Sequence, residues 1–232
     1  MDTHSSPKKI AILLLGGVGK RLDSETPKQF IKISGKPLFF FALDVLENSN
    51  QIDEILIVSA KEHIETVKDL TGCKTKIINV IEGGKSRAES VHNAIEYLLK
   101  NNYDLNSIVI ICDGARPNLK ERYIEETIDN VKSTGAAIVA INATDSIAVS
   151  KDKTIDSYLP RESILIIQTP QTFKLDILKK AYESAKEIDS CTDEGSLVMK
   201  TLNVHPYLVK GDKTNIKITV LEDLEMFERS LK

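Results

Sequence analysis

Cysteine and histidine are scarce in this chain of 232 residues. The three cysteines, Cys73, Cys112 and Cys191, are widely spaced, odd in number and form no C-x-x-C motif. This pattern disfavours a disulfide framework and is typical of reduced thiols in the cytoplasm. The four histidines are scattered, so no histidine-based metal site is indicated. No Ser-His-Asp or Cys-His arrangement points to a side-chain nucleophile.

An excess of charge of one sign is also lacking. The chain has 31 lysines and arginines against 34 acids, and its net charge of −3 does not favour binding to nucleic acid. The first apolar run is too short for a signal peptide or a membrane span. There is no internal repeat or low-complexity linker, and the length fits one α/β domain with an appendage.

The glycine-rich stretch at residues 10–30, IAILLLGGVGKRLDSETPKQF, is the most informative part of the chain. Its apolar run reads as a buried parallel strand that ends in glycines, where backbone N–H groups can approach a ligand closely. Lys20, Arg21 and Lys28 surround the loop. Backbone donors and fixed cations after a strand suit a polyphosphate.

Two familiar phosphate motifs do not fit this loop. A dinucleotide fingerprint starting at Gly17 and Gly19 would need glycine where the chain has Leu22. A P-loop would need glycine at Leu14 and Ser or Thr at Arg21. The stretch is therefore a phosphate loop of another kind or a simple turn.

Strand and helix signals alternate along the first 141 residues of the sequence. We expect strands at 10–15, 55–59, 76–81, 108–112 and 136–141, and helices at 37–47, 61–70, 87–100 and 121–133. This alternation predicts a Rossmann-like α/β fold, a mostly parallel sheet with helices on both faces. Loops at Gly16, Gly83 and Asp113 each follow a strand, so they should meet at the ligand-binding edge of the sheet.

The pattern changes at Asp145. Segments 146–150 and 154–158 flank a turn-like Lys-Asp-Lys and predict a protruding β-hairpin, too small to fold alone. Further on we expect a helix at 174–186, strands at 206–210 and 216–219, and a closing helix at 221–231. The prediction is one domain, residues 1–232, with an arm at about 145–167.

Several segments resemble a known family. The loop L-G-G-x-G-x-R followed by P-K-Q-F is similar to nucleotidyltransferases that activate sugar or polyol phosphates. Further segments resemble one branch, the 2-C-methyl-D-erythritol 4-phosphate cytidylyltransferases. They are GGKSRAESV at 83–91, DGARP at 113–117, QTPQTF at 168–173, TDE at 192–194 and NIKIT at 215–219.

The resemblance implies transfer of a cytidylyl group from CTP to 2-C-methyl-D-erythritol 4-phosphate, with release of pyrophosphate, in isoprenoid precursor synthesis by the non-mevalonate pathway. A sister branch uses ribitol 5-phosphate, and the doubled Gly16-Gly17 favours that branch, whereas the later segments favour the first. A non-catalytic nucleotide-binding protein is a further alternative. An NAD-dependent oxidoreductase is disfavoured by Leu22 and by the lack of an acid cleanly placed after the second strand.

The resemblance also implies the nucleotide site. Arg21, Lys28 and Asp113 would be catalytic, and Asp113 would hold Mg²⁺ together with the CTP phosphates. The residues implied for CTP binding are Leu15, Gly16, Gly17, Gly19, Gly84, Lys85, Ser90, Asp113 and Gly114. For Ser90, a helix residue bonded to its own backbone is the alternative. Arg87 is an alternative organiser of that loop.

The polyol phosphate would be bound by Ser146, Arg161, Thr169, Lys217 and Arg116. Ser146 and Arg161 lie in the arm, which in this family embraces a second subunit, so a homodimer is implied. Arg116 has an alternative role as the structural partner of Asp113. Asp193 either orients cations or caps a helix, and the sequence does not separate these roles.

Overall fold

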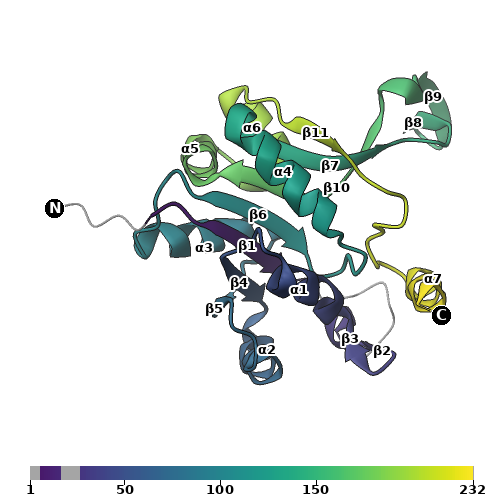
Figure 1. The fold of residues 1–232 in the computed structure, drawn as a ribbon. Helices are drawn as coiled ribbons and strands as arrows, with labels where there is room; N and C mark the ends of the chain where they lie inside the picture. The colour runs from purple at the N-terminus through teal and green to yellow at the C-terminus, as the bar shows by residue number, and fades with distance from the viewer. Residues whose placement is uncertain (1–5, 17–26, 232) are drawn as a thin grey trace.

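A computed structural model describes residues 6–16 and 27–231. Its centre is a seven-stranded sheet of order β11-β7-β10-β6-β1-β4-β5 (Figure 1). Only β10 runs antiparallel to its neighbours, so the expected mostly parallel α/β sheet is confirmed. The strands are β11 (Tyr207–Lys210), β7 (Ala136–Asn142), β10 (Leu165–Lys174), β6 (Ile108–Asp113), β1 (Lys9–Leu14), β4 (Glu54–Ser59) and β5 (Ile77–Glu82).

Helices cover both faces of this sheet, because successive side chains of each central strand point to opposite faces. Ile12 of β1 packs in the core beside three helices, α3 (Arg87–Lys100), α5 (Leu175–Ser184) and α6 (Glu194–Leu202). The next residue, Leu13, packs in the core beside α1 (Leu38–Asn48), α2 (Ile64–Thr71) and α4 (Glu121–Thr134). Both side chains are fully buried, as the continuous apolar run predicts.

A smaller core attaches the C-terminal helix, α7 (Leu221–Ser230). Phe227 of α7 is buried with Ile33, Leu38 and Ile218. Ile33 belongs to a short two-stranded ribbon, β2 (Lys32–Ile33) and β3 (Lys36–Pro37), which follows the single-turn helix η1 (Lys28–Phe30). The C-terminal segment is thereby placed next to the chain that follows the glycine-rich loop.

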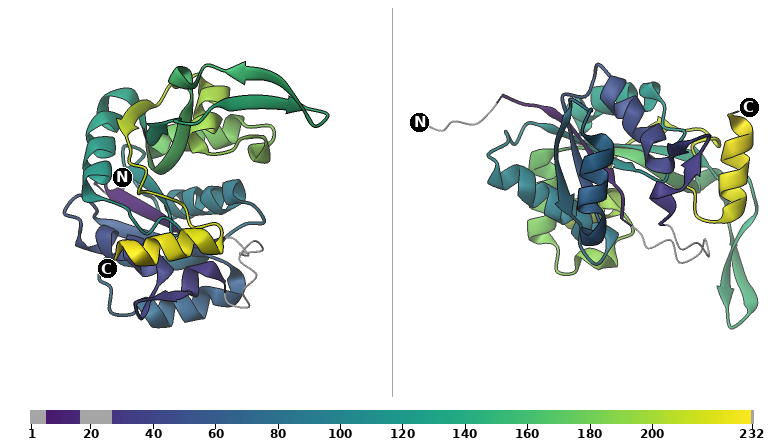
Figure 2. Two further views of the ribbon diagram at one scale, coloured as in Figure 1. Left: turned by 90° about the vertical axis from the view of Figure 1, so that its right-hand side faces the viewer. Right: turned by 90° about the horizontal axis from the view of Figure 1, so that it is seen from below.

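The expected hairpin is present and projects from the body (Figure 2). It consists of β8 (Ile147–Lys151) and β9 (Thr154–Leu159), which pair only with each other in the described chain. Asp152 and Lys153 have φ angles of +48° and +66° and make the tight turn. Every residue of β9 is exposed.

The structure differs from the expected elements in several places, among them the ribbon of β2 and β3. The predicted strand at 216–219 is wrong. Ile218 donates its N–H to the carbonyl of Ala115, in the loop after β6, and its side chain is buried beside α7. Strand β10 and helix α6 are additional. The buried half of β10 is rich in Gln and Thr, whose side chains are hydrogen-bonded. Because this composition is polar, the apolar pattern used to predict buried strands did not detect it.

The remaining short elements are single turns. They are η2 (Lys61–His63), η3 (Arg161–Ser163) and η4 (Ile188–Ser190). In the described part of the chain no helix is long and apolar enough to cross a membrane.

Candidate active site at the carboxyl edge of the sheet

Three loops meet at the carboxyl ends of β1, β5 and β6, as expected. The N–H of Gly114 donates to the carbonyl of Leu14 at 2.9 Å, and the N–H of Leu15 donates to Val58 at 2.8 Å. A Cβ atom on Gly114 would lie 2.5 Å from Cδ2 of Leu15, so any other residue would require the Leu15 side chain to move. Gly16 follows at the same edge.

The structure describes only part of the predicted phosphate loop. Gly17, Gly19, Lys20 and Arg21 lie outside the described residues. Lys28 is described: its Nζ donates to the carbonyl of Ile218 at 3.0 Å. The neighbouring Gln29 is buried and donates from Nε2 to the carbonyl of Leu15 at 2.8 Å. The P-K-Q segment is therefore joined both to the end of β1 and to the C-terminal segment.

Asp113 ends strand β6 and lies among three cations. Its Oδ2 is 2.7 Å from Nζ of Lys217 and 3.9 Å from Nε of Arg116, and its Oδ1 is 3.5 Å from Nε of Arg87. The backbone N–H of Asp113 donates to Oγ1 of Thr169 at 3.2 Å. Three of the residues discussed from the sequence thus border one carboxylate, and a fourth, Thr169, contacts the backbone of the same residue.

The surrounding charges keep this carboxylate ionised. Asp113 is only 7% exposed, and burial by itself disfavours the charged form. Arg87, Lys217 and Arg116 outweigh that effect and lower the pKa of Asp113 to about 2. Asp113 therefore presents a full negative charge at neutral pH, although it lies at the end of an apolar strand.

A second buried acid, Glu194, holds Arg87. Nη1 of Arg87 lies 2.7 and 3.0 Å from the two carboxylate oxygens of Glu194. The Tyr182 hydroxyl lies 3.4 Å from the same carboxylate. Burial of Glu194 raises its pKa, and the Arg87 guanidinium opposes that change. Sequence reasoning did not single out Glu194, and the only available signal was its place in the T-D-E motif.

The loop at residues 83–90 is organised by its own side chains. Oγ of Ser90 accepts the N–H of Gly84 at 3.0 Å and donates to the carbonyl of Ser86 at 2.8 Å. The carboxylate of Glu89 accepts the N–H of Lys85 at 2.6 Å. The backbone N–H groups of Gly84 and Lys85 are therefore paired within the loop, and the Ser90 hydroxyl bonds to backbone.

Arg116 ties two other segments to this site. Its Nη1 donates to the carbonyl of Asn215 at 2.7 Å, and its Nη2 lies 3.4 Å from the carbonyl of Ile167. Asn215 is fully buried and donates from Nδ2 to the carbonyl of Thr169 at 2.9 Å. The Arg116 guanidinium thus links the Asp113 loop, the base of the arm and the segment that carries Lys217.

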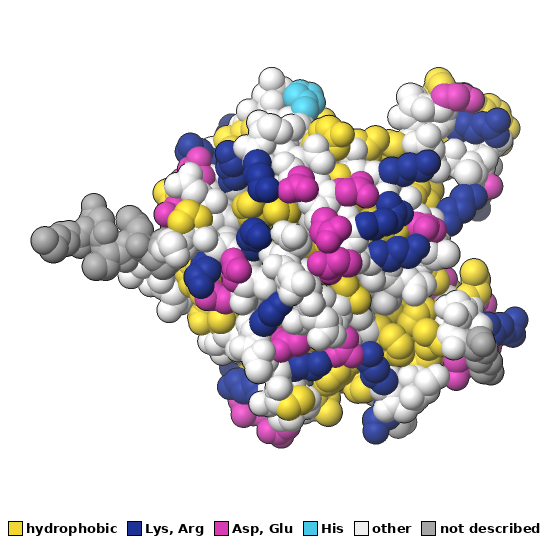
Figure 3. Space-filling view, viewed as in Figure 1, with side chains coloured by type: hydrophobic (Ala, Val, Ile, Leu, Met, Phe, Trp, Pro, Cys, Tyr) yellow, Lys and Arg dark blue, Asp and Glu magenta, His cyan; other side chains and the backbone are white. Residues whose placement is uncertain are grey.

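The two arm residues lie apart from this cluster within the chain. Ser146 and Arg161 are exposed. Nη1 of Arg161 lies 3.5 Å from the carbonyl of Thr144, and its Nε pairs with Glu162 at 3.5 Å. Figure 3 shows lysine and arginine side chains gathered where the hairpin leaves the body. No contact of either arm residue with Asp113 is present in the described chain.

Asp193 acts as a helix cap. Its Oδ1 accepts the N–H of Ser196 at 2.8 Å in a capping box at the start of α6. Its Oδ2 accepts from Nε2 of Gln171 at 3.0 Å. Of the two roles considered for Asp193, its contacts are those of the cap.

Among the described residues, the Asp113 carboxylate is the metal donor that we identify at this edge. Among the described residues, no group of three His, Cys, Asp or Glu side chains could hold an ion. Mg²⁺ commonly binds to proteins through one or two carboxylates together with substrate phosphates. Asp113, ionised and at the edge where the loops meet, fits that mode.

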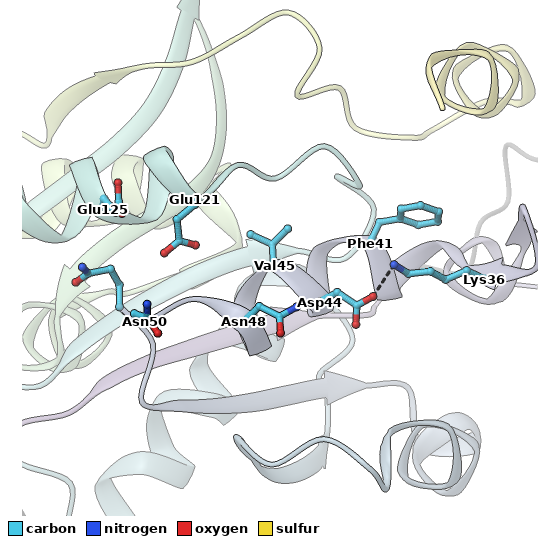
Figure 4. Close-up of a pocket in the computed structure, with 9 residues that line it drawn as sticks. Lys36, Phe41, Asp44, Val45, Asn48, Asn50, Glu121 and Glu125 are labelled. Atoms are coloured by element: carbon cyan, nitrogen blue, oxygen red, sulfur yellow. Dashed lines mark ion pairs between the residues drawn. The ribbon is translucent and has the colours of Figure 1, made fainter. Parts of the chain in front are cut away.

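A separate hollow lies between α1 and the start of α4, as Figure 4 shows. Its lining includes Lys36 and Asp44, whose side chains pair at 2.5 Å. Another lining residue, Gln51, accepts a hydrogen bond from Lys9 at the start of β1, at 3.2 Å. The hollow thus extends toward the amino ends of the strands, and none of the predicted site residues lines it.

Comparison with known proteins gives one consistent result. A family model described as 2-C-methyl-D-erythritol 4-phosphate cytidylyltransferase matches residues 10–232. A relative of that name from Thermosipho africanus is 40% identical over 223 residues, which cover 94% of this chain and 95% of the relative. A second, from Thermotoga neapolitana, is 37% identical over 219 residues, with 94% of each chain covered.

Solved structures agree with the sequence relatives. The crystal structure of 2-C-methyl-D-erythritol 4-phosphate cytidylyltransferase from Francisella tularensis is similar at a TM-score of 0.82 and 28% identity, covering 96% of this chain and 99% of that one. A 4-diphosphocytidyl-2C-methyl-D-erythritol synthase from Anaerococcus prevotii has a TM-score of 0.82 at 26% identity, with 97% and 96% covered. The chain belongs to the 2-C-methyl-D-erythritol 4-phosphate cytidylyltransferase family.

Proposed function

We propose that this protein transfers the cytidylyl group of CTP to 2-C-methyl-D-erythritol 4-phosphate and releases pyrophosphate. The observation that carries the proposal is the cluster of Asp113, Lys217, Arg87 and Arg116 at the edge where the loops meet. A chain of this family with these groups in place has the charges that two polyanionic substrates require.

In this reaction a phosphate oxygen of the polyol phosphate attacks the α-phosphorus of CTP. A new P–O bond forms there, and the bond from the α-phosphorus to the bridging oxygen breaks, so pyrophosphate leaves with that electron pair. The protein needs no covalent intermediate, because positioning and charge neutralisation supply the catalysis. The proposal agrees with the absence of a nucleophilic triad in the sequence.

Two lysines are placed to neutralise phosphate charge. Lys28 donates to the carbonyl of Ile218, and Lys217, one residue earlier in the same segment, pairs with Asp113. We assign Lys28, with Arg21, to the phosphates of CTP, and Lys217 to the polyol phosphate. Each exchanges a protein acceptor for a phosphate oxygen when substrate binds.

The nucleotide would lie against the ends of β1, β5 and β6. We assign the triphosphate to Leu15, Gly16 and Gly114 at these strand ends, and to Gly17 and Gly19, which lie outside the described residues. Gly84, Lys85 and Ser90 would form the side that receives cytosine and ribose. For Ser90 we propose that the contribution is indirect, because its hydroxyl already holds Gly84 and Ser86.

Asp113 would hold Mg²⁺ together with the phosphates of CTP. When bound, the ion would neutralise phosphate charge that the cations of the site leave uncompensated. Asp113 would bind the ion in its ionised form. Arg87 borders its Oδ1 and Lys217 borders its Oδ2. Thr169, which accepts the Asp113 N–H, would complete the polyol side.

We propose a homodimer in which the arm of one chain covers the site of the other. Within one chain Ser146 and Arg161 do not reach Asp113, yet the arm exposes large apolar side chains. Ile155 is 59% exposed and Tyr158 is 66% exposed. A second copy would cover these side chains and would receive Ser146 and Arg161 beside its own polyol phosphate.

The test is pyrophosphate release with CTP and Mg²⁺, comparing 2-C-methyl-D-erythritol 4-phosphate with ribitol 5-phosphate. We expect release with the first acceptor, and at least 100-fold less with the second. Lys28→Ala should abolish release while the far-ultraviolet circular dichroism stays unchanged. Efficient turnover of ribitol 5-phosphate alone would contradict the proposed acceptor, and CTP binding without release on either acceptor would favour a non-catalytic role.

A further inference from the structure

Arg87 occupies a position that local preferences disfavour. It is the first residue of α3, where the helix dipole favours acids and disfavours cations. Ser86 already caps this helix by accepting the N–H of Glu89. The reason for an arginine here must therefore lie in its tertiary contacts, which reach two other segments of the chain.

Through these contacts Arg87 bridges two acids, Glu194 and Asp113. Nη1 of Arg87 contacts both carboxylate oxygens of Glu194, at 2.7 and 3.0 Å, whereas Nε faces Oδ1 of Asp113 at 3.5 Å. The Glu194 side chain is 2% exposed and the Asp113 side chain 9%. Glu194 takes the shorter bonds, so the guanidinium is fixed by Glu194 and only borders Asp113.

Glu194 is itself held from two directions. It is the first residue of α6, where an acid is favoured by the helix dipole, and the Asp193 capping box fixes that helix start. The Tyr182 hydroxyl, from α5, lies 3.4 Å from its carboxylate. A planar guanidinium gripped by a fixed carboxylate has little freedom to rotate, in contrast to a lysine ammonium.

This geometry leaves the second oxygen of Asp113 for other partners. Lys217 contacts Oδ2 at 2.7 Å, on the opposite oxygen from Arg87. If Arg87 were released from Glu194, its fork could pair with both Asp113 oxygens, as arginine and carboxylate prefer. Asp113 would then be turned away from Lys217 and from any ligand at the carboxyl edge.

We propose that Arg87 is a positioning residue, and that Glu194 anchors it so that the Asp113 carboxylate stays available to the nucleotide and its metal ion. The inference rests on the role proposed above for Asp113, and adds the residues that set where its carboxylate lies. Arg87 acts through Asp113 and touches no reacting atom.

The first experiment measures kcat and the half-saturating Mg²⁺ concentration for two conservative variants. Arg87→Lys keeps the charge and loses the fork, and Glu194→Gln keeps the shape and loses the anchor. We expect each to lower kcat roughly 10- to 100-fold, because small misplacements of a catalytic group have effects of that size. We also expect the half-saturating Mg²⁺ concentration to rise several-fold, with thermal midpoints close to that of the wild type.

A matched control is Arg122→Lys in α4, where the arginine pairs with Glu126 on the surface at 3.6 Å. This variant makes the same chemical change away from the site, and its kcat and Mg²⁺ dependence should equal those of the wild type. Since Glu194→Gln leaves a neutral hydrogen-bonding group in the buried position, it tests the inference even if Arg87→Lys fails to fold.

The decisive experiment is a double-mutant cycle with Asp113→Asn. If Arg87 acts through Asp113, then Arg87→Lys has less than a twofold further effect in the Asp113→Asn background. Because that background can be inactive, the cycle is also read as the additional thermal stabilisation that Mg²⁺ gives to the CTP complex. Asp113→Asn should already remove that increment.

Additive losses in the cycle, or variants with wild-type kcat and Mg²⁺ dependence, would overturn the inference and leave Arg87–Glu194 as a structural ion pair. Failure of the proposed function gives a different result, because the wild-type protein itself would then release no pyrophosphate, whether or not it binds CTP. The two failures are therefore distinguished by the wild-type measurement made in parallel.

Discussion

Nζ of Lys217 lies 2.7 Å from Oδ2 of Asp113, and this contact joins the C-terminal segment to the end of the central strand β6. The two residues are far apart in the sequence, and local sequence does not predict that they pair. The Lys217 side chain remains 38% exposed, so its ammonium group can reach a substrate while it borders the carboxylate.

The first prediction concerns Lys217 itself. Lys217→Ala should lower kcat/KM for the polyol phosphate roughly 100-fold, because it removes a charge-assisted donor to a phosphate group. The KM for CTP should change much less. Steady-state kinetics with each substrate varied in turn would measure both values. Lys213→Ala, which removes an exposed lysine that contacts Thr144 at 3.2 Å, is the control and should behave as the wild type.

The second prediction concerns stability and pH. Asp113 has a pKa of about 2 in the folded protein and an ordinary value of 3.8. A lowered folded-state pKa contributes stability above the unfolded value, and that contribution is lost as the pH falls from about 4 toward 2. At neutral pH its size is on the order of 2–3 kcal/mol, since one pKa unit corresponds to about 1.4 kcal/mol.

Urea unfolding of the wild type and Asp113→Asn, from pH 7 to pH 3, measures this contribution. The wild type should be more stable at pH 7, and the difference between the two free energies of unfolding should shrink below about pH 4. A difference that stays constant over the whole range would show that ionised Asp113 contributes nothing specific to folding.

The third prediction concerns the 83–90 loop. The Ser90 side chain is buried, and Ser90→Ala removes both the acceptor of the Gly84 N–H and the donor to the carbonyl of Ser86. We expect a loss of about 1–3 kcal/mol in the free energy of unfolding, the usual cost of a buried group left without its partner. The KM for CTP should rise several-fold, with kcat less affected.

Ser133→Ala provides the matched control, because its hydroxyl also bonds to a helix carbonyl, that of Asn130, but on the exposed side of α4. It should change neither quantity. If Ser90→Ala bound CTP as tightly as the wild type, the loop geometry would not matter for the nucleotide, and direct readout of cytosine by Ser90 would be excluded as well.

The sequence allowed the sheet and its loop-bearing edge to be predicted, because its buried strands are continuous apolar runs separated by amphipathic helices. The boundaries of α3 were correct to the residue, since Ser86 is a clear cap and Lys100 ends the periodic pattern. Strand β10 was missed because its buried residues Gln168, Thr169 and Gln171 are polar. Their burial depends on hydrogen bonds to distant segments, which the local sequence does not reveal.

The site was only partly predictable for a related reason. Asp113 and Lys217 were assigned through resemblance to a family, and the structure places them in contact. The Arg87–Glu194 pair joins two helix starts that are distant in the chain, and no spacing rule encodes such a pairing. The strand expected at 216–219 is wrong because the alternating apolar residues Ile216 and Ile218 pack in the small core beside α7.

The last prediction concerns the arm. Ile155→Asp places a charge on β9 at a side chain that is 59% exposed in the single chain, so it should not disturb the fold of the monomer. If a second copy covers the arm, this buried charge opposes association. We therefore expect sedimentation velocity to show a dimer for the wild type and a monomer for Ile155→Asp.

Activity should fall together with association, because Ser146 and Arg161 would no longer reach a partner's site. Leu105→Asp is the control: Leu105 is an exposed apolar residue outside the arm, 37% exposed, and its replacement should leave a dimer of full activity. Dilution of the wild type below the dissociation constant of the dimer should lower specific activity in the same way, since each site then lacks the arm of a second chain. A monomeric wild type with full, concentration-independent turnover would mean that each chain supplies its own polyol site and that the arm serves another contact.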